Sequence, residues 1–430
     1  MNDFSFFFIG FSFIGFSLLF FVPLFFLIPP LTKGGKEEFK RVPRDIIICI
    51  KKKSSSRPRL SKAGGFFVAS TLFLTGVPFA QGEPALETSR FEKALPGYIF
   101  SFPRDHGSHP AYLIEWWYFT GNLQSKNGYA YGYELTFFRR GIENKFTEAN
   151  PSRWTVHDIY LAHFAVSDIA NKQFYYEEKI SREAMGKAGA QEDKMAVWID
   201  RWSATQAGET MRLIAGAEDF HIDLLLSPAK PLAIHGAEGV SRKGDAPGEA
   251  SHYYSFTRLQ TQGTVRVKGK DASVSGFSWM DHEFGSSLLG KDQVGWDWFS
   301  IQLDDGSDYM FYRIREKDGS RASTSRGTVI ALDGTARHLS SDDFSLNPAS
   351  YWTSPKSGAS YPLSWEISVP SERLSLTWKP ALNDQELITA QSTRVIYWEG
   401  AGHYSGLKNG HPVEGAGYVE LTGYAKALGE

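Results

Sequence analysis

From residue 98 to residue 430 the sequence is a succession of short segments in which apolar and polar residues alternate, separated by Gly, Asn, Asp and Pro. Clear examples are 115–123 (EWWYFTGNL), 129–139 (YAYGYELTFFR), 158–166 (DIYLAHFAV), 220–226 (FHIDLLL) and 298–303 (WFSIQL). A period of two is typical of strands with one buried face, and many short strands between turn residues indicate a sandwich or barrel. We therefore predict an all-β fold, with one short helix over Ser181–Lys187.

Two pairs of segments indicate that this part of the chain is one module written twice. Trp116–Leu123 (WWYFTGNL) reads against Trp296–Leu303 (WDWFSIQL), at an offset of 296 minus 116, or 180 residues. Val274–Asp281 (VSGFSWMD) reads against Val413–Glu420 (VEGAGYVE), at an offset of 413 minus 274, or 139 residues. A β-module of about 140 to 190 residues fits an up-and-down barrel with room for one small apolar ligand. We predict a leading region at 1–97 and two antiparallel β-barrel domains at 98–290 and 291–430.

The leading region carries two hydrophobic segments of the kind used in export. Residues 4–32 contain no charged residue, and a run of more than about 20 apolar residues can span a bilayer. The stretch 63–80 follows a basic segment and precedes the small residues Ala80 and Gly82, the order of a secretory signal peptide. We predict cleavage after Gly82, which leaves 430 minus 82, or 348 residues. The alternative is an inner-membrane protein with two hydrophobic segments. Both interpretations place the folded part outside the cytoplasm, in the periplasm or the extracellular space.

Several classes of function are excluded by what the sequence lacks. The formal net charge is -2 and the later chain has no dense Lys/Arg stripe, so we predict no nucleic-acid partner. The only cysteine, Cys49, precedes the folded part, which rules out thiolate ligands there. The patterns G-x-S-x-G and HExxH and the glycine-rich nucleotide motifs do not occur, so we predict no cofactor and no metal. We expect His106, His109 and His411 in solvated loops.

The densest group of unusual residues is 279–285 (WMDHEFG), followed by 295–298 (GWDW). On a strand, Trp279, Asp281 and Glu283 share one face, and Met280, His282 and Phe284 share the other. Burial beside an indole raises the pKa of a carboxyl group, because the charged form loses its hydration. Asp281 could then act as a general acid near neutral pH. The alternative is that these residues end a strand at a solvated turn.

At these residues the sequence resembles a known family, the carotenoid 1,2-hydratase and AttH-type lipocalin-like proteins. The resemblance covers most of 98–425 and rests on six motifs together. They are 109–123 (HPAYLIEWWYFTGNL), 132–139 (GYELTFFR), 157–166 (HDIYLAHFAV), 279–285 (WMDHEFG), 295–303 (GWDWFSIQL) and 417–425 (GYVELTGYA). It implies a tandem of two lipocalin-like antiparallel β-barrel domains. Carotenoid-hydrating members add water to a terminal alkene without a cofactor, whereas AttH-type members are associated with ABC transporters.

The resemblance also implies a catalytic set. It transfers to Asp281 as the acid, His252 as the group that orients or deprotonates water, and Tyr254 and Trp279 as aromatic faces that stabilise a cation. The two aromatic types stand here in the order opposite to the one expected, which puts carotenoid hydration itself in doubt. We expect ligand contacts from further residues of the six motifs, namely Trp116, Trp117, Tyr118, Tyr133, His163, His282, Glu283, Trp296 and Trp298.

Three functions remain open at this point. The first is an exported lipocalin-like protein that binds a hydrophobic small molecule, such as a polyene, a terpenoid or a lipid-like compound, and acts on it as a hydratase or another lyase. The second is a non-catalytic carrier or an accessory component of an ABC transport system. The third is a structural β-protein whose barrels are filled by their own Trp side chains.

Overall fold

The computed structural model of the chain describes residues 90–142, 155–183, 185–287 and 289–428. These residues form two antiparallel sheets and three short 3-10 helices, η1 (Arg104–His106), η2 (Ser341–Asp343) and η3 (Pro370–Glu372). The prediction of an all-β protein is confirmed. The predicted helix over Ser181–Lys187 is wrong, because its first residues end a strand and Met185 and Gly186 have positive φ angles of 55° and 71°, which no α-helix contains.

The first sheet takes its strands from the chain between residues 114 and 285, in the order β4-β3-β2-β1-β13-β12-β9-β8-β7-β6-β5, with β10 and β11 paired to β12. Its strands are β1 (Ile114–Ser125), β2 (Ala130–Gly141), β3 (Asp158–Asp168), β4 (Gln173–Arg182), β5 (Ala188–Ala190), β6 (Ala196–Ile199), β7 (Trp202–Ala207), β8 (Thr210–Gly216), β9 (Phe220–Pro228), β10 (Ala233–Ile234), β11 (Val240–Arg242), β12 (Ala250–Val267) and β13 (Lys270–Gly285).

The second sheet takes its strands from residues 293 to 421, in the order β17-β16-β15-β14-β23-β22-β20-β19-β18, with β21 paired to β22. Its strands are β14 (Gln293–Leu303), β15 (Asp308–Glu316), β16 (Arg326–Ile330), β17 (Ala336–Leu339), β18 (Ser345–Thr353), β19 (Ser360–Val369), β20 (Leu374–Pro380), β21 (Glu386–Ile388), β22 (Ile396–Lys408) and β23 (His411–Leu421).

The duplicated segments take equivalent places in the two sheets. In the first sheet, β1 lies between β2 and the last strand, β13; in the second, β14 lies between β15 and the last strand, β23. The cross-strand pairs agree as well. Tyr118 of β1 pairs with Asp281 of β13, and Trp298 of β14 pairs with Glu420 of β23. These are the residues that the two sequence alignments matched, so the register supports one module written twice.

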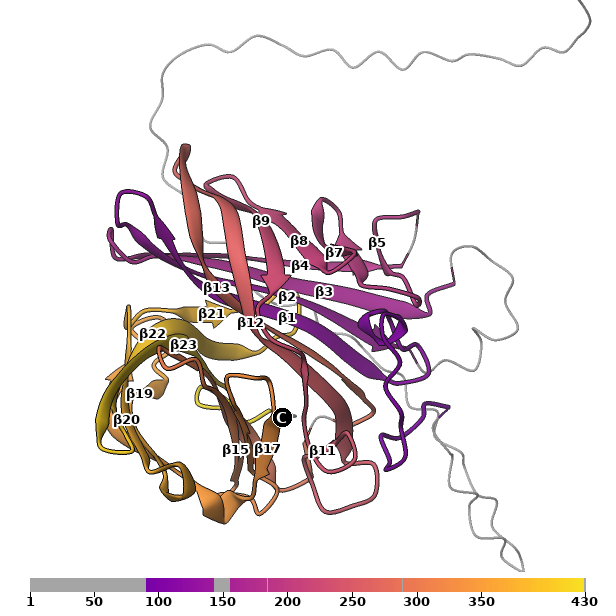
Figure 1. The fold of residues 1–430 in the computed structure, drawn as a ribbon. Helices are drawn as coiled ribbons and strands as arrows, with labels where there is room; N and C mark the ends of the chain where they lie inside the picture. The colour runs from indigo at the N-terminus through magenta and orange to yellow at the C-terminus, as the bar shows by residue number, and fades with distance from the viewer. Residues whose placement is uncertain (1–89, 143–154, 184, 288, 429–430) are drawn as a thin grey trace, which may run out of the picture. The chain divides into compact units, whose positions relative to one another are not determined.

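The two sheets differ in how far they curl. The second sheet curls into a nearly closed barrel, seen end-on in Figure 1, and the first forms a more open half-barrel. The prediction of two β-barrel domains is therefore confirmed in part: the second sheet is nearly a barrel, and the first is a half-barrel. The edge strands include the short β5 and β17, of 3 and 4 residues. Such short edges offer few hydrogen bonds for closure.

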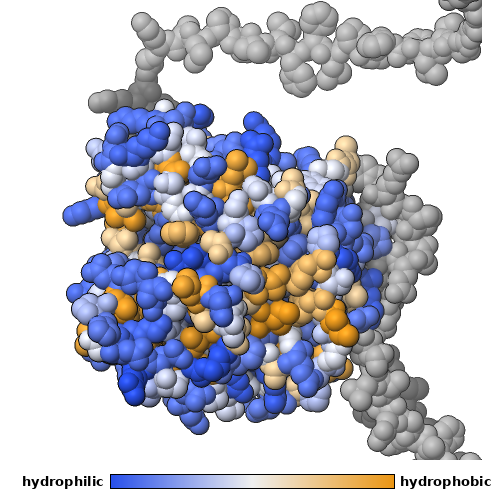
Figure 2. Space-filling view, viewed as in Figure 1, coloured by the Kyte–Doolittle hydropathy of each residue, from blue (hydrophilic) through white to orange (hydrophobic). Residues whose placement is uncertain are grey.

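Large aromatic side chains fill the concave interior of each sheet. The first core includes Trp117 and Trp202, and the second includes Trp365, Trp378 and Trp398, all at most 1% exposed. Close packing of this kind leaves little room for a ligand inside either curl. The face in Figure 2 is mostly hydrophilic, with hydrophobic residues in between.

The sheets meet along a third buried zone, which we call the junction. It is built around Tyr118, Tyr253 and Trp279 of the first sheet and Trp298 and Tyr418 of the second. Figure 1 shows β22 and β23 of the second sheet beside β1, β2 and β13 of the first. Hydrogen bonds cross the junction, including Trp298 Nε1 to Tyr253 OH at 3.2 Å and Gln302 Nε2 to Thr257 O at 2.7 Å.

The predicted division into domains remains a prediction. The chain passes from the first sheet to the second between Gly285 and Gln293, close to the predicted boundary at residue 290, while 82–430 forms one compact unit. The predicted export segments up to Gly82 lie outside the described residues. In the part of the chain that the structure describes, no helix has both the length and the hydropathy of a membrane crossing.

Candidate functional site

Asp281 lies on the face of β13 that points into the junction. The alternation of β13 places Trp279 with it in the junction and Met280 in the core of the first sheet, as predicted. Asp281 pairs with Tyr118 on one side and with Ser255 of β12 on the other, and it is 4% exposed. The carboxyl group is therefore buried between the two sheets, outside the interior of either one.

Three donors hold the Asp281 carboxyl group. Ser255 Oγ and Trp279 Nε1 donate to Oδ1, the latter at 2.6 Å, and Tyr253 OH donates to Oδ2 at 2.8 Å. Burial raises the pKa of Asp281 to about 7; the hydrogen bonds from Ser255, Tyr253 and Trp279 oppose the rise, and the charge of Glu283 adds to it. A carboxyl group with this pKa holds a proton at neutral pH and can give it up, which suits a general acid.

Aromatic rings surround this acid. The rings of Trp279 and Trp298 meet edge to face, with centroids 6.0 Å apart, and Tyr118 meets Trp298 in the same way at 5.2 Å. Their faces carry negative charge density that can stabilise a nearby cation. The site therefore combines a proton donor with groups suited to a carbocation.

Three further buried carboxyl groups face the junction. Tyr118 OH donates to Glu399 Oε1 at 2.5 Å, Trp296 Nε1 donates to Glu420 Oε2 at 2.8 Å, and Tyr397 OH donates to Glu134 Oε1 at 3.2 Å. Burial and mutual repulsion raise their pKa values, to about 8 for Glu134 and about 7 for Glu420, and well above the ordinary range for Glu399. Glu134 Oε2 and Thr120 Oγ1 are buried there without a hydrogen-bond partner.

Sequence reasoning missed most of this group. Glu134 lies in the motif GYELTFFR (132–139), but the sequence analysis gave it no role, and Glu399 lies outside the six motifs. Glu420 carried a signal, because it occupies the place of Asp281 in the second copy of the module. Its partner Trp296 belongs to the predicted ligand-contact set, so the duplication could have marked Glu420 as a second junction acid.

His252 and Tyr254 do not lie with Asp281, which corrects the predicted catalytic set. His252 stacks on Tyr98 with centroids 4.4 Å apart and hydrogen-bonds to Gly239 O at 3.2 Å. Tyr254 OH contacts His106 Nδ1 at 2.7 Å and His282 Nδ1 at 3.0 Å. Both side chains point toward the first sheet's own interior.

A β-bulge in β12 causes this separation. Near the hairpin turn Leu259 pairs with Ser278, but beyond the bulge Phe256 pairs with Met280. Continued without the bulge, the first register would pair Tyr254 with Glu283, on the face of Asp281. The extra residue exchanges the two faces of the strand. Thr257 and Arg258, at the bulge, both donate to Asp308 of the second sheet.

The predicted ligand-contact residues divide in the same way. Trp116, Tyr118, His163, Glu283, Trp296 and Trp298 face the junction or its margin. Trp117, Tyr133 and His282 face the interior of the first sheet. Glu283 is paired with Lys243 Nζ at 2.8 Å.

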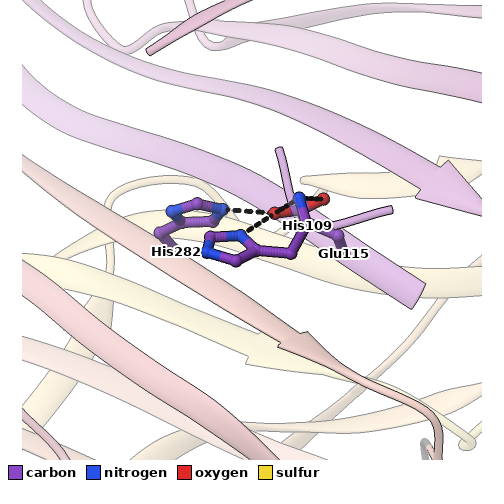
Figure 3. Close-up of side chains that lie close together, drawn as sticks. All are labelled: His109, Glu115 and His282. Atoms are coloured by element: carbon purple, nitrogen blue, oxygen red, sulfur yellow. Dashed lines mark hydrogen bonds and ion pairs between the residues drawn. The ribbon is translucent and has the colours of Figure 1, made fainter. Parts of the chain in front are cut away.

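A second buried polar cluster lies under η1, formed by His109, Glu115 and His282 (Figure 3). His109 Nδ1 and His282 Nε2 lie 2.7 Å and 2.9 Å from Glu115 Oε1, and Arg139 Nε donates to Oε2 at 2.9 Å. Burial opposes ionisation, but the hydrogen bonds of both histidines and the charges of His109 and Arg139 bring the pKa of Glu115 well below its ordinary value.

These contacts decide the character of the cluster. Its ligand-type atoms lie within 4.8 Å of one another, as a metal site requires. They are nevertheless engaged with each other, and the Arg139 guanidinium takes the remaining carboxylate oxygen. We interpret the cluster as an ion-paired network; the prediction of no metal remains a prediction.

Two of the three histidines expected in solvated loops are buried. His106 and His109 are 4% and 2% exposed, whereas His411 is exposed as expected. Phe284 stacks on His109 at a centroid distance of 3.6 Å, and Phe102 covers His106 at 4.6 Å. The loop before β1 is therefore folded onto the first sheet.

The chain was compared with known protein families and solved structures. The chain matches the model of the AttH-like family over residues 93–424. An AttH protein of Nitrosomonas europaea, known from its crystal structure, is 34% identical with a TM-score of 0.70, covering 78% of this chain and 100% of its own. Kievitone hydratase of Nectria haematococca is 13% identical with a TM-score of 0.59, covering 78% of this chain and 97% of its own, and shows a shared fold. No curated protein matches the chain.

Proposed function

The chain belongs to the AttH-like family, and we propose that it is an exported lipocalin-like protein that binds a hydrophobic small molecule and hydrates one of its double bonds. The ligand class is a polyene, a terpenoid or a lipid-like molecule. One observation carries the proposal: the Asp281 carboxyl group is buried among aromatic rings with its pKa raised to about 7. Kievitone hydratase shares the fold, which is compatible with this chemistry, but the proposal does not rest on that similarity.

In the proposed reaction, Asp281 transfers its proton to one carbon of the alkene, which leaves a carbocation on the other carbon. The ring faces of Trp279 and Trp298 stabilise that cation. Water adds to it, and the resulting oxonium releases one proton, so the alkene gains one water in total. His252 points away from Asp281, so we assign the receiving group to Glu420 of the facing sheet. Burial and the charge of Asp281 raise its pKa to about 7, so at neutral pH a share of the molecules has Glu420 ionised and able to accept a proton.

The test is turnover by the variant Asp281→Asn. The purified protein is incubated with polyenes, terpenoid alkenes and unsaturated lipids in ¹⁸O-labelled water, and labelled alcohols are detected by mass spectrometry. The wild type should form a labelled product, and the variant should lose about 10²-fold or more in rate, the share of a general acid. Asp271→Asn, on the exposed end of the same strand, is the matched control.

If both proteins turn over every substrate equally, Asp281 is not the acid and hydration at this site is wrong. The carrier function would survive that result. Mass spectrometry of protein purified from its native source separates the two, because a carrier retains an unmodified ligand and a hydratase releases an alcohol. The same spectra report the N-terminus, which we propose to be Glu83 after signal cleavage. An ABC transporter as partner stays a proposal of the carrier function.

A further inference from the structure

A continuous row of hydrogen-bonding side chains connects Asp281 with the protein surface. Ser255 Oγ donates to Asp281 Oδ1 and lies 2.7 Å from His235 Nε2. His235 Nδ1 lies 2.9 Å from Thr328 Oγ1, and Thr328 Oγ1 lies 3.5 Å from His338 Nδ1. The first three side chains of the row after Asp281 are at most 1% exposed, and His338 is exposed.

Local structure fixes each member of this row. His235 follows β10, and its N–H donates to Tyr253 O at 2.9 Å, which places its ring beside the Tyr253 ring with centroids 4.3 Å apart. Gly236, with φ of 78°, turns the chain away, and a Cβ there would lie 2.0 Å from Val240 O. Thr328 and His338 are cross-strand partners on β16 and β17. The row thus crosses from the first sheet to the second.

We propose that Ser255, His235, Thr328 and His338 form a proton relay between solvent and Asp281. Every member can both donate and accept, and the donors can all point in one direction. His338 Nδ1–H gives a proton to Thr328, whose own proton passes to His235 Nδ1. His235 Nε2–H then gives its proton to Ser255, whose own proton passes to Asp281 Oδ1. One proton enters at His338 and one arrives on the carboxylate, which leaves each histidine in its other tautomer. Rotation of the two hydroxyls and return of both imidazoles to their first tautomer reset the row.

The electrostatic surroundings suit this transfer. Burial keeps the pKa of His235 well below its ordinary value, so its ring is neutral and can accept at Nδ1. The groups facing Asp281 from the packed elements are Tyr118, Lys243, Tyr253, Glu283, Glu399 and Glu420. In turnover the relay would restore the proton that Asp281 gives away, a role that rests on the proposed function.

Proton transfer along the relay is measurable without a substrate. The full mature protein is mixed rapidly with D₂O below the pKa of Asp281, and infrared spectroscopy follows the shift of the protonated carboxyl band, assigned by its loss in Asp281→Asn. Thr328→Val removes the hydroxyl between His235 and His338 at a position that does not contact Asp281, and Thr328→Ser keeps that hydroxyl. Exchange should slow by at least about tenfold in Thr328→Val and stay within about twofold of wild type in Thr328→Ser.

Equal exchange rates in wild type and Thr328→Val would overturn the relay, because the proton would then reach Asp281 through the junction. Should Thr328→Val fail to fold, His338→Gln makes the same test at an exposed position, with the same slower exchange expected. The outcome is independent of the proposed hydration. If Asp281→Asn loses turnover but exchange is unchanged in Thr328→Val, only the relay is rejected. If Asp281→Asn keeps full turnover but exchange slows in Thr328→Val, only the hydration is rejected.

Discussion

Arg139 is the residue that balances the charge of the buried network under η1. Its guanidinium contacts Glu115 Oε2 at 2.9 Å and Asp158 Oδ1 at 2.8 Å, and Nη2 donates to the carbonyls of His109 and Tyr112 at 2.7 Å each. Arg139 and Glu115 are both fully buried. Removing one partner of a buried ion pair leaves the other charge uncompensated, which is far more costly than removing both.

We therefore expect Arg139→Met to lower the free energy of unfolding by about 3–5 kcal/mol. Urea unfolding, followed by tryptophan fluorescence, measures the change. The double variant Arg139→Met/Glu115→Gln should recover part of the loss, because no unpaired carboxylate remains. Arg212→Met, which breaks an exposed pair with Asp223 in the same sheet, should cost at most about 1 kcal/mol. A loss in Arg139→Met no larger than that control would show that the network does not hold the fold.

The residue scale also shows what the sequence could not reveal. His109 stands in the motif HPAYLIEWWYFTGNL, where neighbouring Pro and Tyr residues indicate a loop, and loops are usually solvated. Its burial depends on Glu115, Arg139 and Phe284, which are distant in sequence or carry no local signal. The burial of Asp281 beside an indole was predictable because Trp279 lies two positions away on the same strand face, whereas its partners Tyr253 and Ser255 on another strand were not.

Strands were the most predictable level of the fold. Alternation of apolar and polar residues located β1, β2, β3 and β9. The duplication predicted that Tyr118 and Trp298 occupy equivalent places, and each does pair with the acid of its module's last strand. Alternation defines two faces for a strand, but it does not say which one meets the other sheet. The bulge in β12 leaves no clear sequence signal, so the placement of His252 and Tyr254 could not be obtained.

Gly132 of β2 determines how closely the two sheets approach at the junction. An added Cβ would lie 2.6 Å from Tyr418 OH and 2.7 Å from Ala401 Cβ, both in the second sheet. Such contacts force the strands apart, and overpacking of a buried contact costs about 1–3 kcal/mol. Gly132→Ala should lower the free energy of unfolding by that amount and speed hydrogen exchange in β22 and β23.

The compensating variant Gly132→Ala/Ala401→Gly removes the nearest methyl group and should recover part of both effects. Differential scanning calorimetry and hydrogen exchange with mass spectrometry make the comparison. Unchanged stability in Gly132→Ala would mean that the sheets can shift freely at the junction. Asp281 could not then be held in a fixed, dry setting.

For the whole molecule, the junction connects stability to pH. Asp281, Glu134, Glu399 and Glu420 all have raised pKa values, so the folded state holds protons that the unfolded state releases above about pH 4. Stability from this source is complete below about pH 4 and is lost as the pH rises through each folded pKa. Asp105 and Glu115 have lowered pKa values, so their contribution to stability is present above about pH 4 and is lost only in more acidic solution.

Buried histidines work in the opposite direction at lower pH. Burial lowers the pKa values of His106, His163, His235, His252 and His282, so unfolding takes up protons below about pH 6.5 and stability rises with pH in that range. The two trends oppose each other up to about pH 6.5. Above it these five histidines are neutral in both states. The carboxyl groups remain to titrate together with His109; burial opposes its charge, but hydrogen bonds with Asp105 and Glu115 raise its pKa, so it adds to the loss of stability with rising pH.

The net expectation is a loss of thermal stability between about pH 6.5 and pH 8.5. Each junction acid contributes about 1.4 kcal/mol per pH unit until it releases its proton in the folded state. Differential scanning calorimetry across this range measures the slope. Glu134→Gln and Glu420→Gln replace two of the acids by neutral isosteres and should flatten it, whereas Glu366→Gln on the exposed face of β19 should not. A wild-type melting temperature that stays constant or rises over this range would contradict the assignment of protonated carboxyl groups to the junction, and with it the proton that Asp281 needs for the proposed chemistry.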